Sequence, residues 1–256
     1  MSEGPPPARE RRRRNDGPPP QLAFDLPLEP RYGGEDFLVG ASNEQAYSLV
    51  ESWPDWPDPV ALLEGPHGSG KTHLAAIWAT IAKAWTVDAG AVTMAHVPYL
   101  TSNRALVIED ADRPGLDEAA LFHLLNLARE RGTFVLVTAA APVSGWGLTT
   151  PDLLSRLRLA PSARIEPPDD ALLKAVLVKL FVDRQLTVDT RVVDALALRI
   201  DRSLSMAGAV VDALDREALR RGKRVTRALA AEIADRVADG GASEPDSGEE
   251  GGDNGL

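Results

Sequence analysis

The amino-acid sequence predicts an α/β domain with a parallel β-sheet, followed by a small all-helical domain. Three observations predict this fold class. Short apolar runs alternate with helical periodicities up to residue 138, a glycine-rich loop joins one such run to a helix, and only helical patterns follow Pro167 and Pro168. Strands that alternate with helices form a parallel sheet that the helices cover on both faces.

The expected elements follow one another in a regular order. In the α/β domain, strands are expected at residues 60–63, 91–96, 104–109 and 133–138, and helices at residues 42–52, 71–84 and 117–131. In the second domain, helices are expected at about residues 169–184, 189–200, 203–221 and 226–238. Trp53 and Trp56 precede the first strand, where we expect them to cover the core; a binding role is the alternative.

The two ends of the sequence differ in composition from the part between them. Residues 1–20 are rich in proline, arginine and glycine, and residues 239–256 carry six acids and no base, so we expect both to be disordered tails. The arginine run at residues 11–14 either contacts nucleic acid or a membrane, or is simply solvated. Between the tails we place a short segment at residues 21–30, the α/β domain at residues 31–167 and the helical domain at residues 168–238.

The overall composition excludes several classes of protein. The chain has no cysteine, so it has no disulfide framework and no thiolate metal site. No apolar run approaches the roughly 20 residues of a membrane helix, so we expect a cytoplasmic protein that makes no contact with a membrane. The net charge of −10 argues against a protein that binds nucleic acid non-specifically.

A complete P-loop is the most informative motif. Residues 65–72 read Gly-Pro-His-Gly-Ser-Gly-Lys-Thr and lie between an apolar run and a helical pattern, which is the context of a phosphate-binding loop. The expected ligand is a nucleoside phosphate with Mg²⁺, and the alternative is a glycine-rich loop that matches by chance. The expected nucleotide-binding residues are Gly65, Pro66, His67, Gly68, Ser69, Gly70, Lys71 and Thr72, with the Thr72 hydroxyl on the metal ion.

Two acids follow an apolar strand downstream of the P-loop. The run Leu106-Val107-Ile108 leads into Glu109 and Asp110, an arrangement that delivers one carboxylate to Mg²⁺ and the next to the attacking water. The alternative is a strand that ends in solvated acids. The four histidines are not spaced as a zinc site requires, so we expect no metal besides Mg²⁺.

Several segments together resemble the DnaA/Hda branch of the AAA+ ATPases. They are Phe37-Leu38-Val39-Gly40 with Ser42-Asn43, Gly70-Lys71-Thr72-His73-Leu74, Ser155-Arg156-Leu157 and Ile165-Glu166-Pro167-Pro168, and the resemblance covers roughly residues 21–238. It implies an AAA+ domain that binds ADP or ATP with Mg²⁺, followed by a helical lid. It also implies that Thr72 and Glu109 hold the metal, that Asp110 positions water, and that Arg156 acts as an arginine finger on a neighbouring subunit. The alternative for Arg156 is a surface helix arginine paired with Asp152.

The sequence departs from this branch at three positions that matter for hydrolysis. Glu109 replaces the usual aspartate, Ala139 stands where a polar residue is common, and Ser205 stands where the lid of these proteins carries an arginine. Arg202 lies one helical turn earlier, where it either reaches the nucleotide or remains solvated. We therefore expect weak intrinsic ATP hydrolysis.

Within this branch, the Hda-type regulators are the closest fit. We expect no DNA-reading domain after the lid, and only residues 97–104 separate the second and third expected strands, where the initiator has an extra helix pair. The motif at residues 21–27 resembles a peptide that binds the sliding clamp, with contacts expected from Gln21, Leu22, Phe24 and Leu26. The alternative is a hydrophobic strap on the domain's own surface.

The resemblance implies a regulator of chromosomal replication initiation. Such a protein binds an adenine nucleotide and the sliding clamp, and it stimulates hydrolysis of ATP bound to the initiator DnaA, which prevents re-initiation. Its partners are then DnaA and the clamp, and its contact with DNA is indirect. The resemblance leaves the oligomeric state undetermined, with a homo-oligomer as one alternative. The alternatives are an ATP-driven helicase loader or remodeller of the DnaC kind and a catalytically idle scaffold.

Overall fold

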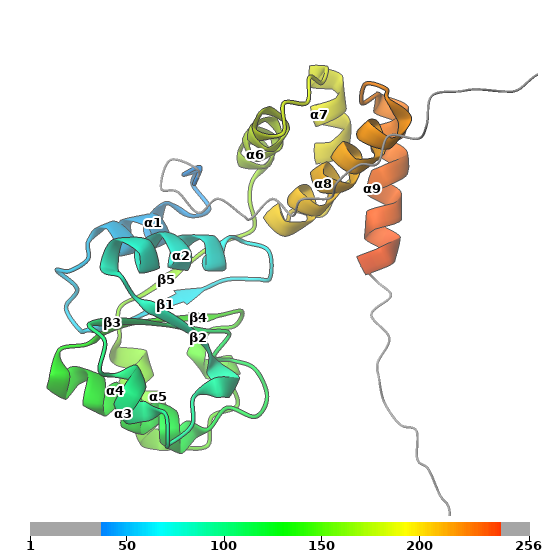
Figure 1. Ribbon diagram of the computed structural model, residues 1–256. Coiled ribbons are helices and arrows are strands. Elements are labelled where there is room, and N and C mark those ends of the chain that lie inside the picture. Colours follow the sequence, from blue (N-terminus) through cyan, green and yellow to red (C-terminus); the bar gives the residue numbers. More distant parts are fainter. Residues whose placement is uncertain (1–36, 242–256) are drawn as a thin grey trace, which may run out of the picture.

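The computed structural model describes residues 37–241 of the chain. Figure 1 shows a layered α/β domain joined to a separate group of helices by a single connecting segment. This arrangement confirms the predicted fold class.

The α/β domain is built on a five-stranded parallel sheet with the strand order β2-β3-β4-β1-β5. The strands are β1 (Val60–Glu64), β2 (Trp85–Asp88), β3 (Ala105–Glu109), β4 (Phe134–Ala139) and β5 (Ser162–Arg164). The three central strands β3, β4 and β1 are almost entirely buried, because their apolar side chains face a helical layer on each side.

Helices cover both faces of this sheet (Figure 1). Helices α1 (Glu44–Glu51) and α2 (Lys71–Ala82) pack on one face, and α3 (Val97–Leu100), α4 (Glu118–Arg131) and α5 (Pro151–Leu159) pack on the other. Short 3₁₀ turns, Ala89–Ala91 and Val143–Gly145, complete the connections on the second face.

The expected role of the two tryptophans in the core is confirmed. Trp56 is buried and stacks on Trp78 of α2 with the ring centroids 5.3 Å apart, and its indole N–H donates to the carbonyl oxygen of Leu49. Trp53 packs edge-on against Trp78 and Phe134. The segment before β1 therefore closes the core beneath α2.

The helical domain consists of α6 (Asp170–Asp183), α7 (Thr190–Ala197), α8 (Leu204–Arg221) and α9 (Arg227–Gly241). Its four helices confirm the sequence prediction. The side chains of Asp169, Asp189 and Ser203 accept backbone N–H groups at the starts of α6, α7 and α8, as helix N-caps do. Its core, which includes Leu177, Phe181 and Leu214, is separate from the core of the sheet.

The prediction of the second strand was wrong. Residues 91–96 form turns, and the strand lies earlier, at Trp85–Asp88, where it pairs with β3 along one edge of the sheet. An edge strand is half solvated, so its side chains do not form a continuous apolar run. The connection from β2 to β3 is consequently residues 89–104 rather than 97–104, and it contains the one-turn helix α3.

Candidate functional site

The P-loop connects β1 to α2 and has a backbone that requires glycine. Gly68 has a φ of +73°, in the left-handed region, and a Cβ atom at Gly65 would lie 2.4 Å from the carbonyl oxygen of Ile165. Helix α2 begins at Lys71, immediately after the loop, so its first amides point toward the enclosed space. The loop therefore has the shape that an anionic ligand needs.

Two polar side chains of the loop are buried inside it. Lys71 donates from Nζ to the carbonyl oxygens of Gly65, at 2.6 Å, and Pro66, at 3.1 Å. Burial lowers the pKa of Lys71, while the carboxylates of Asp110, Asp112 and Glu109 oppose that shift.

The Ser69 hydroxyl is buried and finds no hydrogen-bond partner in the described part of the chain. A buried hydroxyl without a partner costs free energy, and a phosphate oxygen would supply the missing bond. The loop thus fits the phosphates of a nucleotide.

The two acids expected beside the P-loop are there, but their surroundings differ. Burial raises the pKa of Glu109, at the end of β3, and a hydrogen bond from Thr72 opposes that rise. Thr72 and Glu109 are therefore neighbours, as two oxygen ligands for Mg²⁺ must be.

Asp110 is held by its own set of contacts. It has a φ of +55°, its backbone N–H donates to the Thr138 hydroxyl at 3.1 Å, and its carboxylate accepts from Arg113 at 2.9 Å. Thr138, the last polar side chain before Ala139 on β4, thus accepts a hydrogen bond from the backbone of Asp110, which leaves its own O–H able to donate.

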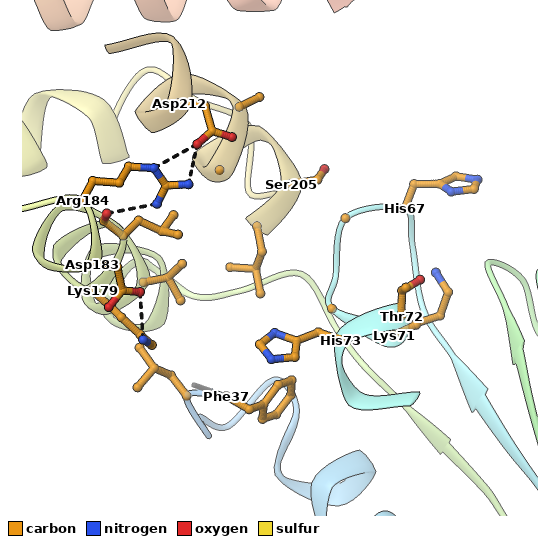
Figure 2. A pocket seen from close by; sticks show the side chains of 18 of the residues that line it. Phe37, His67, Lys71, Thr72, His73, Lys179, Asp183, Arg184, Ser205 and Asp212 are labelled. Atoms are coloured by element: carbon orange, nitrogen blue, oxygen red, sulfur yellow. Dashed lines mark hydrogen bonds and ion pairs between the residues drawn. The ribbon is translucent and has the colours of Figure 1, made fainter. Parts of the chain in front are cut away.

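A cavity of about 760 Å³ extends from the P-loop to the helical domain (Figure 2). From the α/β domain it is lined by Phe37, Leu38, His67, Gly68, Gly70, Lys71, Thr72, His73 and Asp110, and from the helical domain by Val176, Lys179, Leu180, Asp183, Arg184, Leu204, Ser205, Gly208, Ala209 and Asp212. Its volume is within the range of small-molecule sites. Phosphates would lie at the P-loop end, and the rest of the cavity has room for a base and a sugar.

The start of α8 rests directly on the P-loop. The backbone N–H of Leu204 donates to the carbonyl oxygen of Gly68 at 2.8 Å. The hydroxyls of Ser203 and Ser205 lie 2.9 Å from each other, and they approach Gly68 so closely that a Cβ atom there would meet them at 2.2 and 2.4 Å. Ser205, the position without an arginine, therefore contributes a hydroxyl to the cavity.

The helical domain brings two cations to the cavity, Lys179, which pairs with Asp183 at 2.9 Å, and Arg184; neither was expected from the sequence. Arg184 is the one held by a second helix. Its Nε donates to Asp212 on α8 at 2.9 Å, and its Nη1 donates to the carbonyl oxygen of Leu180 at 3.1 Å (Figure 2). No sequence motif marks this residue, because its partner Asp212 lies on another helix.

Arg202, which we expected on the nucleotide, does not line the cavity. Its guanidinium is exposed and pairs with Asp170 at 2.9 Å. The alternative of a solvated arginine describes its environment, and its partner there is Asp170. The backbone turns between α7 and α8, and this turn directs Ser203 and Ser205 to the P-loop instead.

Arg156 lies on α5, on the face of the sheet opposite α2 (Figure 1). Its guanidinium carbon is 5.1 Å from the centre of the Phe122 ring, and within residues 37–241 it forms no ion pair, so the alternative pairing with Asp152 is not made.

The start of α5 is held by the carboxylate of Glu118. This carboxylate accepts the backbone N–H groups of Thr149 and Thr150 at 2.9 and 2.7 Å. Hydrogen bonds from Thr150 and Thr149 hold the pKa of Glu118 at about 2. The helix that carries Arg156 is thereby anchored to α4.

The predicted clamp-binding residues Gln21, Leu22, Phe24 and Leu26 lie outside the described residues, as do the arginine run and the end of the acidic tail. Among the described helices, none is long and apolar enough to cross a lipid bilayer.

Comparison with known proteins places this geometry in context. The chain is similar to chromosomal replication initiator proteins DnaA, with 24% identity over 216 residues in Thermotoga petrophila and 23% over 244 residues in Flavobacterium psychrophilum. These matches cover 73% and 84% of this chain but 49% and 50% of the relatives, so the chain spans about half the length of the curated proteins it matches. No protein-family model matches the chain.

Solved structures show the fold. Domain III of Thermotoga maritima DnaA superposes with a TM-score of 0.72 and 20% identity, covering 83% of this chain and 99% of that domain. The fold is AAA+. The AMPPCP-bound DnaA of Aquifex aeolicus gives a TM-score of 0.64 at 19% identity over 84% of this chain and 71% of that one. The Holliday junction branch migration motor RuvB of Thermotoga maritima gives 0.61 at 19% identity over 78% of this chain and 69% of that one.

The chain is accordingly a distant homologue of DnaA, and its fold is that of domain III of DnaA. The helices α6 to α9 form the helical domain that follows the sheet, which we call the lid, and the cavity lies between this lid and the P-loop.

Proposed function

We propose that this chain is an AAA+ regulator of replication initiation. In this proposal it binds an adenine nucleotide with Mg²⁺, docks on the sliding clamp through residues 21–27, and stimulates hydrolysis of the ATP held by the initiator DnaA. The proposal extends the distant homology with DnaA by assigning a role to three features: the cavity, the glutamine motif and Arg156.

The cavity supports the nucleotide part of the proposal. The P-loop amides and Lys71 would hold the phosphates, Ser69 would donate its hydroxyl to a phosphate oxygen, and Thr72 with Glu109 would hold Mg²⁺. When bound, the metal ion neutralises phosphate charge and orients the nucleotide. Phe37 and His73, whose rings meet edge-to-face with centroids 5.4 Å apart, form an aromatic wall against which a base would pack.

The environment of Arg156 is the single observation that carries the proposed activity. An arginine finger must leave its own subunit and reach a neighbour's phosphates, so it needs a side chain that no carboxylate of its own domain holds. Arg156 is partly exposed, has only the Phe122 ring as a described partner, and projects from a helix on the sheet face opposite its own P-loop helix.

The expected slow hydrolysis by the chain itself is consistent with a regulatory role. The carboxylate of Asp110 is engaged by Arg113, the Thr138 hydroxyl is engaged by a backbone N–H, and Ala139 has no polar atom in its side chain. The groups that could position a water molecule are therefore partly engaged within the chain, which favours slow hydrolysis. We infer that nucleotide binding serves mainly to fix the lid and the α/β domain in one arrangement.

A single-turnover assay tests the proposal. Purified DnaA loaded with radiolabelled ATP is mixed with clamp on DNA and either the wild-type chain, the Arg156→Ala variant or the Arg158→Ala variant. Arg158 is exposed, lies on the same helix and forms no described ion pair, so it is the matched control. We expect Arg156→Ala to lose the stimulation, since trans arginine fingers contribute roughly 10³–10⁵ in rate in other NTPases.

Two results contradict the proposal. Full stimulation by the Arg156→Ala protein would remove the finger role. Rapid ATP turnover by this chain alone would favour the alternative of a helicase loader of the DnaC kind.

A further inference from the structure

A strongly basic surface lies at the far end of the lid, at the turn between α8 and α9. Residues 216–227 carry six bases and one acid, whereas the whole chain has a net charge of −10. The bases are Arg216, Arg220, Arg221, Lys223, Arg224 and Arg227, and all six are exposed. We call this set, together with Arg236 on the adjacent helix α9, the basic surface.

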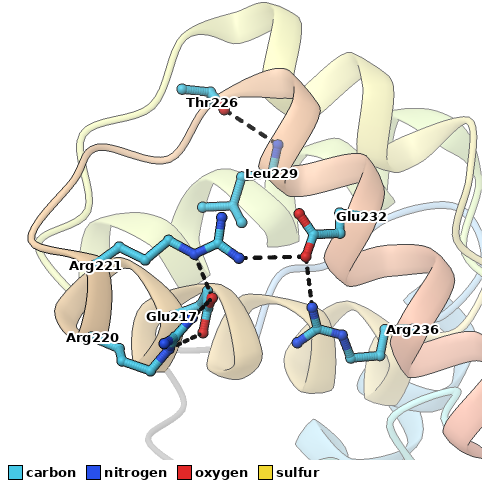
Figure 3. A network of polar contacts seen from close by, with 7 residues as sticks. All are labelled: Glu217, Arg220, Arg221, Thr226, Leu229, Glu232 and Arg236. Atoms are coloured by element: carbon cyan, nitrogen blue, oxygen red, sulfur yellow. Dashed lines mark hydrogen bonds and ion pairs between the residues drawn. The ribbon is translucent and has the colours of Figure 1, made fainter.

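Part of the basic surface is ordered by two carboxylates (Figure 3). Glu217 accepts from Arg220 at 2.6 Å and also pairs with Arg221, while Glu232 accepts from Arg236 at 2.7 Å and pairs with Arg221 at 3.4 Å. Hydrogen bonds and charge from Arg220 and Arg221 hold the pKa of Glu217 at about 2, so its charge persists at neutral pH. Three guanidinium groups thus share two carboxylates and are fixed in position across α8 and α9.

The other cations have no such partners. Within the described part of the chain, Arg216, Lys223, Arg224 and Arg227 form no ion pair. Lys223, Arg224 and Arg227 therefore face solvent around the ordered arginine network. The charge of Arg216 is partly offset by the neighbouring Asp215, where burial raises the pKa of the carboxyl and the charge of Arg216 opposes that rise. A protein with an acidic surface elsewhere maintains such a local excess at the cost of self-repulsion, so an external anion is the expected partner.

The side chains of the basic surface indicate which kind of anion it binds. A lipid surface would require an apolar helix face that can insert. The apolar residues of α8 and α9, including Val210, Leu214, Leu229 and Ile233, are buried in the lid core, and Leu219 is the exposed large apolar side chain of these two helices in the described chain. Guanidinium groups instead match phosphate oxygens in geometry and charge.

We propose that the basic surface binds the phosphate backbone of a nucleic acid. This contact goes beyond the proposed function, in which the chain meets DNA only through the clamp, and it stands independently of Arg156 and of the cavity. The low overall pI of about 4.9 does not oppose it, because charges more than about 10 Å away are screened at 0.1 M salt. The low pI does, however, predict that the contact with nucleic acid is weak and salt-sensitive.

The expected salt dependence follows from the unpaired cations. If the four of them neutralise phosphates, the slope of log K against log salt on duplex DNA is roughly −3.6. Raising the salt from 50 to 200 mM then weakens binding roughly a hundredfold.

The test measures fluorescence anisotropy of a labelled 20-base-pair duplex, and of a single strand of the same length, with the full chain. The Arg224→Ala/Arg227→Ala variant removes two unpaired cations and should lower the salt slope by about 2 and the affinity at 50 mM salt by at least about tenfold. The matched control Arg104→Ala/Arg158→Ala removes the same charge from exposed positions of the α/β domain and should leave both unchanged.

Because the arginine run at residues 11–14 is present in both variants, only the difference between them reports on the lid. The duplex and single-strand arms show which nucleic acid supplies the backbone. The proposal is overturned if the wild-type chain binds neither probe at 50 mM salt, or if the lid variant and the control lose equal affinity. It is equally overturned if the lid variant loses binding to phosphatidylglycerol vesicles and not to DNA.

Discussion

The contact between the lid and the P-loop can be tested with one added methyl group. At Gly68, a Cβ atom would lie 2.2 and 2.4 Å from the hydroxyls of Ser203 and Ser205, and the backbone φ is +73°. Gly147 has nearly the same φ, +69°, but nothing lies within 4 Å of the position of its Cβ atom. The variants Gly68→Ala and Gly147→Ala therefore impose the same kind of backbone strain, and only the first one pushes the lid away.

The expected loss of stability in each variant follows from two effects, the backbone strain and the displacement of the lid. An alanine in the left-handed region costs about 1–2 kcal/mol, which is the full expected effect of Gly147→Ala. Gly68→Ala adds the separation of α8 from the loop and the loss of the hydrogen bond from Leu204 to the Gly68 carbonyl oxygen, about 1 kcal/mol. For a protein of this size, each kcal/mol lowers the melting temperature by about 2–4 °C, so Gly68→Ala should melt at least that far below Gly147→Ala.

The assay is thermal unfolding followed by circular dichroism, together with titration of a fluorescent ADP analogue. Gly68→Ala should also weaken nucleotide binding, whereas Gly147→Ala should not. A third variant, Gly68→Ala with Ser203→Gly and Ser205→Ala, removes both hydroxyls and should recover part of the lost stability. Equal melting temperatures for the Gly68 and Gly147 variants would show that α8 does not rest on the loop, and the description of the cavity would then be wrong.

Three further predictions test separate parts of the molecule. Lys71→Ala should abolish the rise in melting temperature that excess ATP or ADP gives the wild type, a stabilisation of about 2.7 kcal/mol at one hundred times the dissociation constant; if nucleotide fails to stabilise the wild type, the site is misassigned. Hydrogen bonds lower the pKa of Glu118 in the folded chain to about 2, from an ordinary value of 4.5, so its contribution to stability is complete above pH 4.5 and is lost as the pH falls toward 2. Urea midpoints measured across this window should fall less steeply for Glu118→Gln than for the wild type, and equal pH dependence would contradict the capping role. Gln21→Ala with Leu22→Ala should abolish clamp binding in a pull-down, whereas deletion of residues 1–20 should leave the affinity within a few-fold; an unchanged affinity of the double variant would reject the motif.

Much of the candidate site was predictable because its signals are local. The P-loop needs glycine at fixed offsets and a lysine at the start of a helix, and each requirement is visible in the consecutive residues 65–72. The strand that ends in Glu109 and the buried strand β4 are continuous apolar runs, because helices cover both of their faces. The lid helices likewise show their helical period, and Asp169, Asp189 and Ser203 mark three of their starts.

What the sequence left open depends on residues that are distant along the chain. The edge strand β2 is recognised only by its pairing with β3, and Arg184 is held in the cavity by Asp212 on α8 as well as by the carbonyl oxygen of Leu180. The basic surface is local in sequence, but its ordered part depends on Glu232 and Arg236 from the neighbouring helix.

Arg202 shows most directly the difference between what sequence spacing predicts and what tertiary packing decides. Sequence spacing put Arg202 near the nucleotide, because one helical turn separates it from Ser205 if the helix extends that far. In the structure, α8 begins only at Leu204, and the turn before it directs Arg202 to Asp170 and the two serines to Gly68. Helical spacing predicts neighbours within a helix, and tertiary packing decides where the helix begins and which loop it meets.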